Sequence, residues 1–262
     1  MRDRADRLLV GRGLAPSREK AQAFIMAGLV SSGSRAVLKP GDLIDADAEI
    51  TLKGRMPFVG RGGLKLAEAL DRFGLSVAGW VAVDIGASTG GFTDCLLQRG
   101  ARRVYAVDVD TKQLDGGLRN DPRVVAVEKN ARYLEAADLA ESPDLITLDV
   151  SFISILKILP ALKEIPGPWL LLALIKPQFE AGRADVRKKG IVRDPAIHAK
   201  VLARVAQGGR EHGFGLRGLI RCSTRGQKGN VEFFGLWAKG EAGRPADAVP
   251  AWIKEAVGNE NH

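Results

Sequence analysis

The chain has 262 residues, enough for one large α/β core and a small appended module, and its 39 basic and 31 acidic side chains leave a formal charge of +8. This surplus favours a polyanionic partner, with nucleic acid as the leading candidate, because long-range attraction and counterion release both strengthen binding. Cys95 and Cys222 form no CxxC pair and the three histidines show no ligand spacing, so the composition argues against a disulfide framework and a structural metal and fits a reducing cytoplasm.

Residues 1–55 predict a small module of two short helices followed by strands. Ser17 can cap the second of these helices, in which apolar residues recur at helical spacing. A glycine-containing linker at residues 56–63 leads into the main domain, residues 64–262. The chain is therefore expected to hold two domains.

Five short sequence motifs follow one another in the first module: Arg7-Leu8-Leu9, Gly13-Leu14-Ala15, Ser17-Arg18-Glu19-Lys20-Ala21, Gly28-Leu29-Val30 and Lys39-Pro40-Gly41-Asp42. Because of these motifs, the module resembles the alpha-L RNA-binding fold, which was first named for a ribosomal small-subunit protein and is found in pseudouridine synthases. The resemblance implies a face that contacts phosphates and positions RNA without reading its sequence. The basic residues expected at this face or at the linker are Arg12, Arg18, Lys20, Arg35, Lys39 and Arg61. A small stabilising cap is the alternative interpretation.

Beyond the linker, short apolar runs alternate with helical segments. The expected strands are Val81–Val83, Val104–Val107, Val124–Val127, Leu145–Leu148 and Leu170–Ile175. Repeated strand–helix units favour an α/β fold with a doubly wound parallel sheet, in which ligands bind beyond the carboxyl ends of the strands. The last run belongs to the most apolar stretch of the chain, but it is far shorter than the ~20 residues of a membrane-spanning helix, so we expect no membrane partner.

A glycine-rich loop follows the first of these strands. Its spacing is GxxxGG rather than the GxGxxG of dinucleotide sites, which favours S-adenosylmethionine over NAD as the cofactor. The candidate cofactor-binding residues of this segment are Asp84, Gly86, Ala87, Ser88, Thr89, Gly90, Gly91 and Phe92. Asp108 ends the next strand, where its carboxylate could accept hydrogen bonds from both ribose hydroxyls of the cofactor. Asn130 follows the third strand and could bond to the adenine edge.

Four ionisable residues stand beside apolar or glycine-rich segments, where a charge needs partners. They are Lys65, Asp149, Lys176 and Glu232. An ion-pair network at a domain edge is the ordinary interpretation of any one of them. Together with the glycine loop, the four indicate chemistry.

With these motifs in place, the main domain resembles the FtsJ-type ribose 2′-O-methyltransferases, and the whole chain resembles their TlyA branch, often labelled hemolysins. The resemblance implies a Rossmann-like fold and S-adenosylmethionine as cofactor. It also implies a catalytic tetrad that maps onto Lys65, Asp149, Lys176 and Glu232. The implied substrate is a cytidine ribose in ribosomal RNA, on one or both ribosomal subunits.

A ribose hydroxyl must lose its proton as it attacks a sulfonium methyl group, so a base is required. Lys176 is the candidate base, because a second lysine, the cofactor's charge and partial burial would all disfavour its protonated form. Asp149 would orient this lysine and the methyl group, while Lys65 and Glu232 would hold the hydroxyl and balance the charge.

Two other functions stay open from the sequence. One is a non-catalytic RNA-binding protein associated with the ribosome; the other is a membrane-lytic hemolysin, for which the sequence shows no pore segment. Near the candidate base, Gln178 and Glu180 are expected to be solvated. The basic segment Arg183 to Lys189 predicts either an RNA-contacting loop or a solvated connector.

Overall fold

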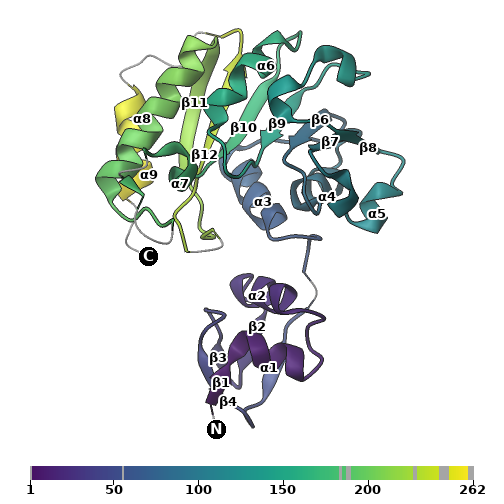
Figure 1. The fold of residues 1–262 in the computed structure, drawn as a ribbon, viewed down its shortest axis with the longest axis vertical. Coiled ribbons are helices and arrows are strands. Elements are labelled where there is room, and N and C mark those ends of the chain that lie inside the picture. Colours follow the sequence, from purple (N-terminus) through teal and green to yellow (C-terminus); the bar gives the residue numbers. More distant parts are fainter. Residues whose placement is uncertain are drawn as a thin grey trace. The chain divides into compact units, whose positions relative to one another are not determined.

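The computed structural model describes residues 2–54, 56–182, 185–186, 190–226, 229–241 and 248–258. The basic residues of the segment Arg183 to Lys189 lie outside the described residues. The chain folds into two compact units, Met1–Leu64 and Lys65–His262 (Figure 1).

Two helices and two small sheets form the amino-terminal unit. Its elements are β1 (Arg2–Arg4), α1 (Ala5–Gly11), α2 (Arg18–Met26), β2 (Val30–Ser32), β3 (Arg35–Ala36), β4 (Leu43–Asp45) and β5 (Ile50–Leu52). β1 pairs with β4, and β2 pairs with both β3 and β5, always antiparallel. Ser17 caps α2 by accepting a hydrogen bond from the backbone N–H of Lys20, as the sequence predicts. Apolar residues of both helices and the strands, among them Leu9 and Ile25, form a shared core.

A seven-stranded sheet forms the larger unit, in the order β11-β12-β10-β9-β6-β7-β8. Its strands are β6 (Val81–Ile85), β7 (Arg103–Asp108), β8 (Val124–Glu128), β9 (Leu145–Leu148), β10 (Leu170–Ile175), β11 (Phe214–Arg221) and β12 (Phe233–Lys239). β6 to β10 are parallel and confirm the five predicted strands. The predicted doubly wound sheet is thus present and mostly parallel; at its other edge, β12 runs antiparallel to both β10 and β11.

Helices cover this sheet, whose strand interiors are largely apolar and buried (Figure 1). The helices are α3 (Gly62–Phe73), α4 (Gly91–Gln98), α5 (Gly116–Arg119), α6 (Leu159–Glu164), α7 (Pro177–Glu180), α8 (Pro195–Glu211) and α9 (Ala248–Gly258), with short 3-10 helices η1 (Thr111–Gln113), η2 (Ala131–Tyr133), η3 (Ala136–Asp138) and η4 (Ile155–Lys157). α4 packs against β6 and β7, whereas α8 and α9 pack against β11 and against each other. Over the described part of the chain, no helix combines the length and the apolar character needed to cross a bilayer.

The direction of strand succession reverses between β6 and β9, which lie side by side at the centre of the sheet. The chain proceeds outward from β6 through β7 to β8, then returns to β9 and continues to β10. Loops that leave the carboxyl ends of β6 and β9 therefore diverge, and ligands of doubly wound sheets bind at this point. The backbone N–H of Asp149 donates to the carbonyl of Ile85 at 2.9 Å, which keeps the two strand ends together.

Gly209 lies inside α8, next to the ring of Trp237 in β12. A Cβ atom at Gly209 would lie 2.7 Å from Trp237 Nε1, closer than packing allows. We expect Gly209→Ala to lower the free energy of unfolding of the larger unit by about 1–3 kcal/mol, because the ring must shift. This loss would outweigh the gain of up to ~1 kcal/mol that alanine brings to a helix interior. Urea denaturation followed by tryptophan fluorescence measures the change.

Gly116→Ala in α5 is the control, because a Cβ at Gly116 would meet nothing within 4 Å. We expect this variant to be unchanged or to gain up to about 1 kcal/mol. Equal losses in the two variants would contradict the packing explanation.

Candidate active site

The glycine loop turns sharply between β6 and α4. Gly86 has φ +83° and Gly90 has φ +96°, values that favour glycine, and Ser88 between them has φ +50°. A Cβ at Gly86 would overlap the backbone carbonyl oxygen of Asp149, and one at Gly90 would overlap the side chain of Leu118. The loop is therefore packed directly against the end of β9 with no room for side chains at these two positions.

Asp84 lies beneath this loop and is fully buried. Thr93 Oγ1 donates to one of its carboxylate oxygens at 2.7 Å, and Thr147 Oγ1 donates to the other at 3.1 Å. Burial raises the pKa of Asp84 to about 7, against the opposing effect of the two hydroxyls. The buried Asp84, predicted from the sequence as a cofactor-binding residue, thus ties α4 and β9 to β6.

The remaining predicted cofactor residues divide by exposure. Ser88 and Thr89 are exposed on the loop, whereas Ala87 and Gly91 are buried in it. Phe92 is also buried, and its ring centroid lies 6.1 Å from that of Phe234 in β12. Its role in the described structure is packing beneath the loop.

Asp108, at the end of β7, contacts the glycine loop. Its Oδ2 accepts a hydrogen bond from the backbone N–H of Ser88 at 2.9 Å, and its Oδ1 accepts one from the N–H of Asp110 at 3.2 Å. Each carboxylate oxygen keeps a second lone pair, so the group can still accept hydrogen bonds from two hydroxyls. Asn130 caps η2, because its Oδ1 accepts from the backbone N–H of Arg132 at 3.1 Å. Its amide nitrogen is then the group that can donate to a ligand.

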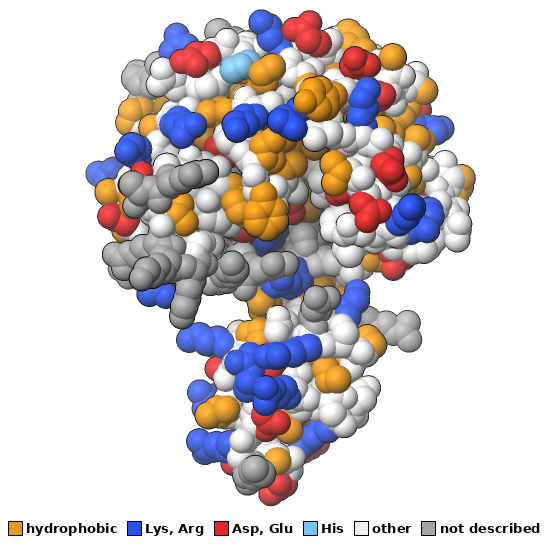
Figure 2. Space-filling model, viewed as in Figure 1, with side chains coloured by type: hydrophobic (Ala, Val, Ile, Leu, Met, Phe, Trp, Pro, Cys, Tyr) orange, Lys and Arg blue, Asp and Glu red, His pale blue; other side chains and the backbone are white. Residues whose placement is uncertain are grey.

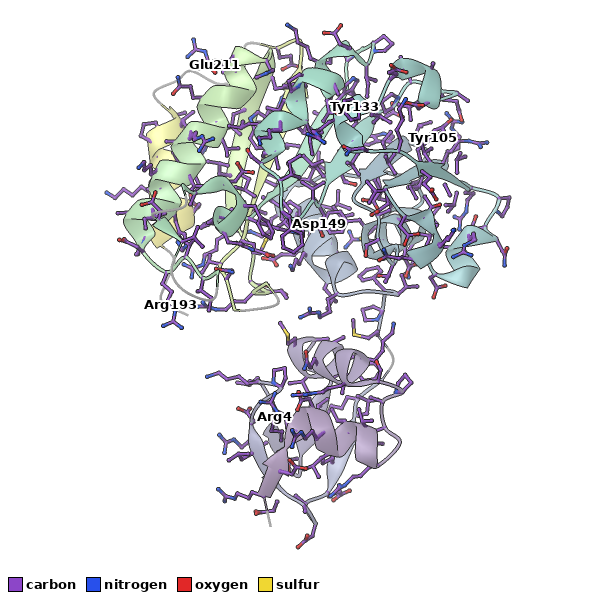
Figure 3. All side chains as sticks on the ribbon, viewed as in Figure 1. Arg4, Tyr105, Tyr133, Asp149, Arg193 and Glu211 are labelled. Atoms are coloured by element: carbon purple, nitrogen blue, oxygen red, sulfur yellow. The ribbon has the colours of Figure 1, made fainter. Side chains whose placement is uncertain are left out.

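The four predicted ionisable residues come together from four different elements, and we call them the ionisable quartet. Lys65 lies in α3, Asp149 directly follows β9 (Figure 3), Lys176 directly follows β10, and Glu232 directly precedes β12. Lys65 Nζ lies 2.5 Å from Glu232 Oε2, and Lys176 Nζ lies 2.5 Å from Asp149 Oδ1. Lys176 Nζ also donates to Ser151 Oγ at 3.1 Å. Two ion pairs with no net charge thus stand beside the glycine loop.

The two lysines differ in their surroundings. Burial, the largest influence, lowers the pKa of Lys65, but the charges of Glu232 and Asp149 and the hydrogen bond to Glu232 outweigh it, so that the pKa lies above its ordinary value. Lys65 is therefore a fixed cation and a poor base. Lys176 is partly exposed and faces the hydroxyl of Ser151 as well as Asp149, so it is the better placed of the two to meet a substrate.

Phe152 is a residue of this site that the sequence analysis did not single out. Its side chain is 91% exposed, and its backbone has φ +66°, a conformation that non-glycine residues rarely adopt. Its ring centroid lies 5.1 Å from that of Phe179, which in turn lies 6.0 Å from Lys176 Nζ. The signal in the sequence is an aromatic residue three positions after Asp149. An exposed ring held in this way offers a flat apolar surface beside the ion pair.

Glu180 is not solvated, so that expectation was wrong. The residue is only 3% exposed, because α7 is a single turn that brings its last residue over the loop after β9. Its Oε2 accepts from Ser154 Oγ at 2.6 Å and its Oε1 accepts from the backbone N–H of Ile155 at 2.7 Å. Burial raises the pKa of Glu180 above its ordinary value, although these hydrogen bonds act against the shift.

In the amino-terminal unit, Asp6 is a fully buried carboxylate that holds two arginines. Arg4 donates to both of its oxygens at 2.9 Å, Arg18 Nε donates to Oδ2 at 2.8 Å, and Gln22 Nε2 donates to Oδ2 at 2.9 Å. The hydrogen bond from Arg4 is the largest influence on the pKa of Asp6, which lies well below its usual range despite burial. Arg18 was predicted from the sequence. The sequence analysis missed Arg4, which could have been found from its position two residues before Asp6.

The other predicted RNA-contacting residues of this unit fall into two groups. Arg12 donates to the carbonyl oxygens of Ala48, at 2.7 Å, and Ala46. Lys20 Nζ donates to the carbonyl of Val59 at 3.0 Å, and Arg61 donates to the sulfur of Met26. Arg35 and Lys39 are exposed. Figure 2 shows Lys and Arg side chains gathered on one face of this unit.

Residues 58–239 of the chain match the FtsJ-like methyltransferase family. Among relatives, the 16S/23S rRNA (cytidine-2′-O)-methyltransferase TlyA of Mycobacterium tuberculosis (strain ATCC 25618 / H37Rv) is 41% identical over 94% of this chain and 93% of its own. Hemolysin A of Brachyspira hyodysenteriae is 43% identical over 88% of this chain and 97% of its own. A solved structure of a hemolysin candidate from Streptococcus thermophilus is 45% identical, with a TM-score of 0.76 over 98% of this chain and 94% of that chain. The chain therefore belongs to the FtsJ-like methyltransferase family, together with TlyA and hemolysin A.

Proposed function

We propose that this protein transfers a methyl group from S-adenosylmethionine to the 2′-hydroxyl of a cytidine ribose in ribosomal RNA, in the cytoplasm. The observation that carries the proposal is the ionisable quartet, assembled at the strand ends where the glycine loop contacts Asp149. The TlyA relative, named as an rRNA cytidine-2′-O-methyltransferase and similar over nearly the whole chain, supports the substrate.

The residues around the glycine loop fit S-adenosylmethionine. Gly86 and Gly90 let the loop turn sharply and pack against Asp149 and Leu118, and this turn leaves Ser88 and Thr89 exposed for a ligand. Asp108 would accept hydrogen bonds from the ribose hydroxyls of the cofactor, and Asn130 would bond to the adenine edge. When bound, the cofactor supplies an electrophilic methyl group on a sulfonium. Asp84 would act from below, by holding the loop in shape.

Within the quartet, Lys176 would take the proton of the attacking 2′-hydroxyl. Only the neutral amine can accept this proton. Asp149 fixes the position of the Lys176 amine through their 2.5 Å contact. Lys65, paired with Glu232, would donate a hydrogen bond to the 2′ oxygen and stabilise the negative charge that develops on it. Phe152 offers its exposed ring to the target nucleotide for stacking.

The amino-terminal unit would dock the RNA. Asp6 sets the guanidinium groups of Arg4 and Arg18 beside one another, and both arginine side chains remain partly exposed. Guanidinium groups bind phosphate oxygens in a fork-like geometry, so a prearranged pair suits the RNA backbone. Exposed Arg35 and Lys39 would add further phosphate contacts.

Lys176→Ala is expected to lower methyl transfer to ribosomal subunits at least about 100-fold, because general-base catalysis is lost, while S-adenosylmethionine binding stays within a few-fold of wild type. Labelled cofactor, separated subunits and mass spectrometry of the RNA measure transfer and locate the methylated nucleotide. Lys200→Ala is the matched control, since the Lys200 side chain is 77% exposed on α8 and is expected to be dispensable. Near-normal turnover by Lys176→Ala would remove Lys176 as the base.

Asp108→Ala is expected to weaken binding of S-adenosylmethionine at least about 10-fold, because hydrogen bonds to a charged acceptor are lost. Isothermal titration calorimetry measures the affinity without any need for RNA. Asp121→Ala is the control, because Asp121 is a strand-flanking acid that pairs with Arg123. The assignment of Asp108 fails if both variants bind the cofactor as tightly as wild type.

Asp6→Asn is expected to weaken binding of an rRNA fragment about 10-fold, because Arg4 and Arg18 lose their common anchor and must be ordered on binding. The direction of the change in RNA affinity distinguishes the two explanations. The substitution raises the net charge of the protein by one, so bulk electrostatics alone would strengthen RNA binding, whereas loss of the arginine anchor weakens it. Asp45→Asn makes the same charge change at an exposed acid that pairs with Arg2.

Fluorescence anisotropy over a range of salt concentrations compares these two variants with wild type, and thermal melting checks that each is folded. Arg18→Lys keeps the positive charge but removes the bidentate guanidinium group, and we expect it to weaken RNA binding as well. Unchanged affinity in both Asp6→Asn and Arg18→Lys would rule out the arginine pair as an RNA contact.

A further inference from the structure

The Asp149–Lys176 pair is formed by the residues that directly follow β9 and β10. β9 and β10 pair in parallel as far as Leu148 and Ala173, and the ladder between them ends there. Asp149 is the first residue past that point on its strand, and Lys176 is the third past it on the other. Strand pairing alone therefore does not set the distance between the carboxylate and the amine.

Glu180 joins these two segments. It ends the helix α7 that Lys176 begins as N-cap, and both of its carboxylate oxygens bond to the loop that Asp149 begins. The partners are the hydroxyl of Ser154 at 2.6 Å and the backbone N–H of Ile155 at 2.7 Å. These lengths are typical of charge-assisted hydrogen bonds, which are stronger than neutral ones.

The surroundings hold Glu180 itself in place. Arg204 of α8 donates to the backbone carbonyl of Glu180 at 3.1 Å, and the side chain of Glu180 is almost wholly withdrawn from water. A polar group buried to that degree costs free energy unless its partners are present, so the loop cannot move away cheaply. The contact between the rings of Phe152 and Phe179 joins the same two segments nearer to the surface.

We propose that Glu180 is a positioning residue for methyl transfer: it fastens the loop after β9 to α7 and thereby fixes Lys176 against Asp149 and Phe152 beside them. This inference rests on the proposed function. Glu180 is buried away from the surface and would act only through the geometry of the pair. A displacement of reacting groups by about 1 Å can lower a rate about 100-fold, so the effect of losing this connection appears in turnover.

The test compares Glu180→Ala, Glu180→Gln and wild type in steady-state methyl transfer to ribosomal subunits, with calorimetric titration of S-adenosylmethionine. Glu180→Ala is expected to lower kcat about 10-fold to 100-fold while KM for the subunit and Kd for the cofactor change by less than about 3-fold. Glu180→Gln is expected to recover kcat to within about 3-fold, because a glutamine can accept from the Ile155 N–H and donate to the Ser154 hydroxyl.

Ile253→Ala is the control for stability, because Ile253 is a buried residue of α9 in the core of the same unit. It is expected to lower the melting temperature and to leave kcat within about 2-fold of wild type. If Glu180→Ala cannot be purified folded, Ser154→Ala replaces it, since that variant removes one donor and is expected to lower kcat in the same direction.

The positioning role is overturned if Glu180→Ala, or Ser154→Ala in its place, keeps the kcat of Ile253→Ala. It is also overturned if the loss appears in KM or cofactor affinity alone, or if Glu180→Gln is as impaired as Glu180→Ala. If wild type itself transfers no methyl group to either subunit, the proposed function falls and the positioning role falls with it. An active wild type with an equally active Glu180→Ala overturns the positioning role alone.

Discussion

Parallel pairing of β6 with β9 is the constraint on which the candidate site depends. It places the loop after one strand against the residue that ends the other, so closely that a Cβ at Gly86 would overlap the carbonyl oxygen of Asp149. The glycine loop and Asp149 of the ionisable quartet are thereby set by one packing contact. The buried Asp84, held by the hydroxyls of Thr93 and Thr147, reinforces the same contact from below.

Charge balance is the second organising feature. Each buried or partly buried lysine of the quartet meets one carboxylate at 2.5 Å, which compensates the loss of hydration that an isolated charge would suffer. In the amino-terminal unit the cations outnumber the carboxylate. The single buried carboxylate of Asp6 pairs with two arginines, which leaves a surplus of positive charge near the surface. The first pattern suits a site that moves a proton, and the second suits a surface that binds a polyanion.

The sequence was sufficient for features that repeat along the chain and insufficient for those that depend on contacts between distant loops. The five parallel strands followed from their apolar runs. The quartet residues followed from their apolar or glycine-rich neighbours together with the resemblance to the FtsJ-type family. Glu180 looked solvated because its neighbours in sequence are not uniformly apolar, and its burial depends on a loop 26 residues earlier in the chain. Arg4 and Phe152 were missed for a similar reason: the bond to Asp6 and the exposed ring beside Phe179 are visible only once the chain has folded.

The antiparallel strand β12 carries a consequence for the order of events during synthesis. Lys65 and its partner Glu232 are separated by 167 residues, so the quartet cannot close until Glu232 has left the ribosome. The amino-terminal unit is built from the first 64 residues and can fold long before that. A nascent chain thus presents its basic unit first and acquires its complete set of ionisable groups last.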